Sequence, residues 1–133
     1  MTAAEAAPPF ARGIRELWRS RLGLEVREVG SGPLETGRSL IAVVRPWGDP
    51  RSGLVLECPA PLARRAAAVL RRTEAHLLTI EEVEEAVREL AADTGALVWP
   101  HGRAGGARPT GDRRLQRALF ACEGHVFRVT VVD

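Results

Sequence analysis

Three glutamates spaced by four residues are the first side chains in this sequence that could do chemistry. Glu81, Glu85 and Glu89 fall in one row if residues 79–94 form a helix, because a helix turns by about 100° per residue. A row of carboxylates can receive a basic group from a partner. It is also typical of a solvated helix face, since the helix dipole favours glutamate near the N-terminus. The spacing alone leaves both interpretations open.

Two further residues share this face of the helix. Arg88 lies beside the row, and Ala92 lies near the centre of the face, where its small side chain allows close approach. The segment 79–94 contains six acidic residues and one arginine, a formal charge of −5, whereas the whole chain carries +2. This asymmetry indicates a surface with a binding role. We call the five residues the acidic face: Glu81, Glu85, Arg88, Glu89 and Ala92.

The helix that carries the acidic face has clear local signals. Thr79 and Glu82 form a T-x-x-E pair, which predicts a capping box at its start. No proline or glycine interrupts the segment before Gly95. The opposite side of the helix is expected to pack on the core through residues at helical spacing. These are Ile80, Val83, Val87, Leu90, Thr94 and Leu97.

The rest of the chain predicts helices and β-hairpins in separate blocks. One helix is expected from Phe10 to Gly23 and another from residue 59 to about residue 72. Strands are expected over residues 24–29, 38–58 (a hairpin) and 114–132, a closing hairpin with its turn at residues 123–124. This segregation favours the α+β class with a mainly antiparallel sheet backed by helices. The Ala/Pro-rich residues 1–9 are predicted to be disordered and residues 10–133 to form a single domain.

Burial can be predicted for the tryptophans and for the last strand. Trp18 lies on the apolar side of the first helix and Trp99 follows the acidic helix, so both are expected to pack in the core. Trp47 lies among turn residues at the tip of a hairpin, which makes it a candidate partner contact. Alternation along the last strand puts two sets of residues on opposite faces: Phe127, Val129 and Val131, and Val126, Arg128 and Thr130.

Length and composition exclude several classes of protein. The 133 residues correspond to one domain. The longest apolar runs, such as residues 40–44, are far shorter than the roughly 20 residues of a membrane helix. No leader of basic and then apolar residues is recognised. Cys58 and Cys122 are interpreted as buried thiols in a reducing compartment, so a cytoplasmic location is expected. The scattered histidines predict no metal site.

The basic residues allow a second hypothesis, an arginine-rich nucleic-acid-binding domain. All 19 are arginines, and clustered arginines could contact phosphates. However, aromatic residues make up only 5% of the chain and tyrosine is absent, which weakens base stacking. Solvated arginines are the favoured interpretation, and nucleic acid is a disfavoured partner. The candidate contacts would be Arg64, Arg65, Arg71, Arg72, Arg103, Arg108, Arg113, Arg114 and Arg117.

Several short segments occur in an order that is typical of one known family. Residues 54–59 resemble a strand written V-x-L-x-C-P, residues 62–67 an L-A-x-x-x-A helix, and residues 81–91 a helix that carries an E-x-x-N signature. Residues 107–110 are similar to S-L-P-T. The chain therefore resembles the chemotaxis phosphatase family of CheC, CheX and FliY, and CheX most of all. The resemblance implies an antiparallel sheet backed by helices and a homodimer joined through sheet edges.

The resemblance also implies a role in two-component signalling. Members of this family dephosphorylate a CheY-type response regulator, which itself holds Mg²⁺ beside its phosphoryl group, so this chain is expected to need no cofactor or metal of its own. The phosphatase adds a carboxylate that pairs with a lysine of the regulator and an amide that orients the attacking water. Glu89 matches the carboxylate position and Glu85 the position before it. The amide position is Ala92.

Alanine at the amide position predicts a phosphatase-like pseudoenzyme, because its side chain neither donates nor accepts a hydrogen bond. The expected function is docking on a phosphorylated receiver domain with lost or weak phosphatase activity, and whether the chain is an enzyme stays open. Asp93 is rotated by about 100° towards the core edge and is not expected to substitute. The alternative is an active phosphatase that takes its amide from elsewhere. The chain has no asparagine, and its only glutamine is Gln116, expected on a strand.

Overall fold

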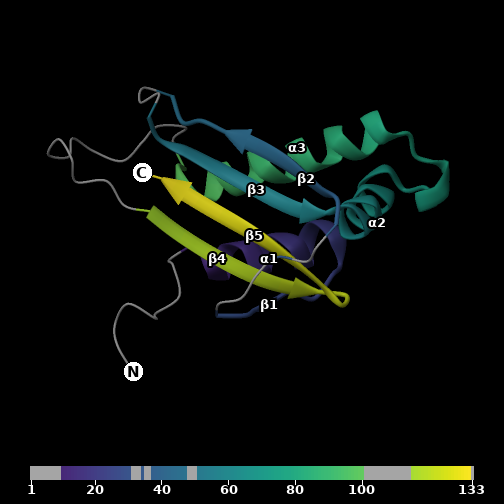
Figure 1. Ribbon diagram of the computed structural model, residues 1–133, viewed down its shortest axis with the longest axis horizontal. Helices are drawn as coiled ribbons and strands as arrows, with labels where there is room; N and C mark the ends of the chain where they lie inside the picture. Colours follow the sequence, from purple (N-terminus) through teal and green to yellow (C-terminus); the bar gives the residue numbers. More distant parts are fainter. Residues whose placement is uncertain (1–9, 31–33, 35–36, 48–50, 101–114, 133) are drawn as a thin grey trace, which may run out of the picture.

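Five antiparallel strands form one sheet in the order β1-β4-β5-β3-β2 in the computed structural model (Figure 1). The structure describes residues 10–30, 34, 37–47, 51–100 and 115–132. The predicted α+β class with a mainly antiparallel sheet is confirmed. The strands are Arg27–Glu28 (β1), Ser39–Val44 (β2), Gly53–Pro59 (β3), Leu115–Cys122 (β4) and His125–Val132 (β5).

The two faces of the sheet differ in burial. Leu54 and Leu56 of β3 and Phe127 and Val129 of β5 are fully buried, whereas the residues between them are half-buried. Alternate residues of a strand point to opposite faces, so one face lies under the helices and the other is open. The prediction for the two faces of the last strand is confirmed.

Helix α1 (Ala11–Leu22) covers the buried face through Trp18. The Trp18 ring stacks on Phe127 of β5 with a centroid separation of 4.3 Å, and Phe127 stacks in turn on Phe120 of β4. Gly23 ends the helix with a φ of +66°, a left-handed conformation that glycine adopts at little cost. The burial predicted for Trp18 is confirmed. Trp99 is also buried, whereas Trp47 is exposed.

Helix α2 (Ala60–Arg71) leads through the short 3₁₀ turn η2 (Ala75–Leu77) to helix α3 (Ile80–Val98). Arg64 of α2 holds this connection, because its Nη1 donates to the carbonyl oxygens of Ala75 and Leu78, each at 3.1 Å. The predicted capping box of α3 is present. The Glu82 N–H donates to Thr79 Oγ1 at 3.2 Å, and the Thr79 N–H donates to Glu82 Oε1 at 3.0 Å.

Helix α3 packs on β2 and β3. Four residues of the predicted stripe are buried, but Ile80 and Leu97 are 39% and 40% exposed, because they lie in the first and last turns of the helix. The helix continues through Gly95, where a Cβ would lie 2.9 Å from Val44 Cγ1 of β2. The missing side chain therefore lets α3 lie directly against the edge strand.

The strand predicted over residues 24–29 is shorter than expected. Strand β1 comprises Arg27 and Glu28, opposite Ala121 and Phe120 of β4, and the Val29 N–H continues the pairing with a hydrogen bond to the Leu119 carbonyl oxygen at 2.9 Å. Strand β4 ends at Cys122 in the turn to β5, so the residues before Arg27 have little strand left to pair with. The two predicted hairpins are confirmed where the structure describes them. The predictions for residues 1–9 and 101–114 lie outside the described residues.

Candidate functional site

The acidic face lies on the outer side of α3. Glu81, Glu85, Arg88 and Ala92 are exposed and Glu89 is half-buried. Glu85, Glu89 and Ala92 follow one another at spacings of four and three residues, so they form one continuous strip. A carboxylate and a small residue are thereby presented together by a rigid helix, where a partner surface could reach both.

Glu89 already has a cation beside it. Arg71, in the last turn of α2, donates a hydrogen bond from Nη2 to Glu89 Oε2. This bond is the main cause of a lowered Glu89 pKa, with the Arg71 and Arg21 charges adding to it and burial opposing it. The same bond raises the pKa of Arg71, and the charge of Glu85 adds to that effect. A basic group from a partner would therefore have to displace Arg71 or share Glu89 with it.

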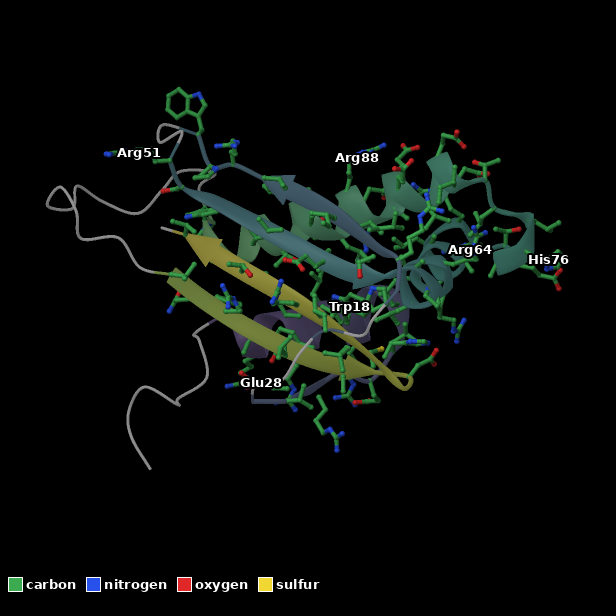
Figure 2. The ribbon with its side chains drawn as sticks, in the orientation of Figure 1. Trp18, Glu28, Arg51, Arg64, His76 and Arg88 are labelled. Carbon is green, nitrogen blue, oxygen red and sulfur yellow. The ribbon has the colours of Figure 1, made fainter. Side chains whose placement is uncertain are left out.

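Two neighbours of the strip have other surroundings. Asp93 Oδ2 lies 3.4 Å from Arg21 Nη1 of α1, so the carboxylate next to Ala92 in sequence is already engaged by a cation. Arg88 lines a groove between α3 and β2 rather than the side that holds Glu89. Figure 2 shows Arg88 extending outward from α3. The structure thus brings Glu85, Glu89 and Ala92 together and places Arg88 at the border of a second surface.

Gln116 lies in β4, whereas α3 packs on β2 and β3. Strand β5 lies between β4 and β3 in the sheet. Its amide therefore comes from a different part of the sheet than Ala92. Of the candidate nucleic-acid contacts, Arg64, Arg65 and Arg71 are engaged within the chain, Arg65 with Glu123 at 3.0 Å. The candidates at residues 103, 108, 113 and 114 lie outside the described residues.

The described residues contain no group of three or more His, Cys, Asp or Glu side chains that could hold a metal ion. None of the described helices is long and apolar enough to cross a membrane. Cys58 and Cys122 are buried free thiols, and burial raises the pKa of Cys122 to about 11, so this thiol is a poor nucleophile at neutral pH.

The fold matches solved structures over nearly its whole length. The chemotaxis protein CheX from Desulfovibrio desulfuricans superposes with a TM-score of 0.60 at 12% identity, over 94% of this chain and 97% of that one. CheX from Vibrio vulnificus gives a TM-score of 0.59 at 13% identity, over 94% of each chain. This chain has the CheX-like fold. A CheC-like superfamily protein from a Shewanella species gives 0.50 at 11% identity, over 93% of this chain and 94% of that one. No protein-family model and no curated protein sequence matches the chain.

In this CheX-like fold, Arg71 is the residue of the site that the sequence analysis missed. It was noted only among the candidate nucleic-acid contacts. The one local signal is its position in the last turn of α2, where basic residues are favoured by the helix dipole. Its contact with Glu89 spans 18 residues and exists only because α2 packs beside α3.

Arg71→Gln is expected to raise the pKa of Glu89 towards its ordinary value of 4.5, because the substitution removes the main cause of the lowered value. A carboxylate with a lowered pKa stabilises the fold above that ordinary value, and this contribution is lost as the pH falls through the folded-state pKa. The variant should therefore lose at most about 1 kcal/mol at pH 7, since the pair is partly exposed, and less at pH 2. Urea unfolding at both pH values and ¹³C NMR titration of Glu89 test this.

The matched control is Arg12→Gln, which breaks the exposed pair of Arg12 with Glu16 on α1. This pair should contribute little at either pH, because both side chains are largely solvated. An unchanged Glu89 titration in the Arg71 variant would contradict the assignment of Arg71 as the cause.

Proposed function

We propose that this chain docks on the phosphorylated receiver domain of a CheY-type response regulator and has little or no phosphatase activity. One observation carries the proposal: Glu85, Glu89 and Ala92 occupy one accessible strip of α3 in a CheX-like fold, with alanine at the amide position. The likeness to the CheX structures supports the fold, and the residue pattern of α3 supports the docking role. The setting would be two-component signalling in the cytoplasm.

The chemistry of phosphoryl transfer explains why Ala92 matters. Catalysis comes mainly from positioned groups that orient the water and stabilise charge. Ala92 presents only a methyl group, and Glu89, which would pair with a lysine of the regulator, is held by Arg71. The carboxylates of the strip still supply a negative charge for docking. Mg²⁺ would be held by the receiver domain, so this chain supplies no metal ligand.

Titration with CheY-type receiver domains of the source organism, with and without beryllofluoride in place of the phosphoryl group, tests the docking role. At least one of these receiver domains should bind the chain more tightly with beryllofluoride than without it. Glu85→Lys should weaken its binding about tenfold or more, because a carboxylate facing a basic surface becomes a like charge. Glu16→Lys on α1 makes the same charge change outside α3 and should have little effect. Failure of every receiver domain to bind, or equal effects of the two substitutions, would refute the proposal.

A homodimer through sheet edges also stays a prediction. The two edges of the sheet are β1, with two residues, and β2, with six. Of these two described edge strands, β2 offers the longer backbone for strand pairing. Residues 38–45 include Arg38 and Arg45 but no acidic residue, so two copies of β2 would bring together arginines without a compensating carboxylate from the strand itself.

A further inference from the structure

A groove of about 390 Å³ runs between the edge strand β2 and helix α3. One wall is formed by residues 38–43, which include most of β2, and the other by Glu84, Val87 and Arg88. At Gly95, α3 lies directly against Val44 of β2. Nearer the N-terminus of α3, at Glu84, Val87 and Arg88, the groove separates the helix from the strand. The groove is therefore bordered along its length by the backbone of an edge strand.

The outer edge of β2 has backbone groups available for pairing. The Ala60 N–H donates to the Arg38 carbonyl oxygen at 2.9 Å, which shows that Arg38 faces β3. Backbone direction alternates along an antiparallel strand, so Leu40 and Ala42 also face β3. Ser39, Ile41 and Val43 then point their N–H and C=O groups outward, and no described strand pairs with β2 on that side.

The side chains along the groove indicate what could occupy it. Ile41 and Val43 are 64% and 56% exposed on the open face of the sheet. On the helix side the charged residues are Arg38, Arg88 and Glu84, which give a net positive charge. Within the described part of the chain, none of these three side chains has an ion-pair partner. The groove thus combines unpaired strand backbone, apolar contact on one face and a net positive charge on the other.

We propose that this groove binds an extended acidic segment of a partner protein, which adds to β2 as a further strand. In such β-augmentation the backbone provides affinity and alternate side chains provide specificity. Aliphatic side chains of the segment would lie beside Ile41 and Val43. The residues between them would face α3, where carboxylates pair with Arg88 and Arg38. The charge favours this occupant over a second copy of β2, because residues 38–45 contain no carboxylate that could pair with Arg38 and Arg88.

The probe is a capped ten-residue peptide that alternates valine and glutamate, and its control alternates valine and lysine. With the full chain, the glutamate peptide is expected to bind at least about tenfold more tightly, because each pairing with an arginine becomes a repulsion in the lysine peptide. ¹⁵N NMR should show the largest amide shifts at Ser39, Ile41 and Val43. The probes contain no receiver domain, so this result is independent of the proposed function.

Arg88→Glu should weaken binding of the glutamate peptide about tenfold and improve binding of the lysine peptide. Arg15→Glu, an exposed site on α1 with the same charge change, should alter neither. Ile41→Pro should abolish binding, because it removes an outward N–H that would donate to the peptide. The variant is expected to fold, since proline is tolerated on edge strands. Should that variant not fold, N-methylation of alternate peptide residues removes the reciprocal hydrogen bonds, which the peptide N–H groups donate to the outward carbonyl oxygens of β2, and this should also abolish binding.

Three results would overturn the proposal. The first is no binding of the glutamate peptide at millimolar concentration to the folded chain. The second is equal affinity for both peptides. The third is a dimer of the chain, detected by sedimentation, in which the amides of Ser39, Ile41 and Val43 are protected from exchange, because a second copy would then be the occupant.

Discussion

The Ala92→Asn substitution is expected to raise the rate at which a bound, phosphorylated receiver domain loses its phosphoryl group by about 100-fold. The expected rate increase is inferred from other active sites, where removal of one positioned hydrogen-bonding group lowers the rate about 100- to 1,000-fold. Ala92 is exposed one turn beyond Glu89, so an amide there extends from the same strip. The amide can both accept from and donate to the attacking water.

The measurement is the decay of a ³²P-labelled receiver domain that binds the chain, with the chain in excess. Ala96→Asn, one turn farther along and also exposed, is the matched control and should leave the wild-type rate unchanged. Glu89→Gln in the Ala92→Asn background should remove most of the gain, because the carboxylate and the amide act on the same phosphoryl group. A wild-type chain that already accelerates decay as strongly as the variant would contradict the pseudoenzyme assignment.

Trp18→Ala is expected to lower the free energy of unfolding by about 3–5 kcal/mol. The Trp18 side chain is only 1% exposed, and its ring lies on Phe127 with an interplanar angle of 9°. Its removal leaves a cavity between α1 and the sheet at the point where the helix is anchored. Because domains are stable by only about 5–15 kcal/mol, a large fraction of the variant molecules should be unfolded at moderate urea concentrations.

Urea unfolding followed by far-ultraviolet circular dichroism measures this loss as a lower midpoint at an unchanged slope. The control is Trp47→Ala, where the side chain is 69% exposed, and a change within about 0.5 kcal/mol is expected. Equal losses for the two variants would show that Trp18 does not anchor α1. Trp18→Phe should recover part of the loss, since a smaller ring can still stack on Phe127.

Local sequence signals determined the elements of this protein. The capping box of Thr79 and Glu82, the stop at Gly23 and the turn at residues 123–124 each depend on residues only a few positions apart. Such contacts form whenever the local backbone adopts its preferred geometry, so helices, hairpins and the α+β class could be predicted. The same local rules placed Glu85, Glu89 and Ala92 on one face of α3. The strand over residues 24–29 was overestimated because its length depends on where β4 ends.

The tertiary structure alone decided what surrounds those residues. Among the described strands, the order β1-β4-β5-β3-β2 makes β2 the longer edge, and the packing of α2 beside α3 puts Arg71 on Glu89. The packing of α3 against β2 also places Arg88 in the groove, apart from the rest of the acidic face. These contacts join residues far apart in the chain, and their energies depend on how whole elements dock rather than on local propensity. Periodicity can therefore predict that a helix face is acidic, but only the packing of its neighbours determines which carboxylates remain available to a partner.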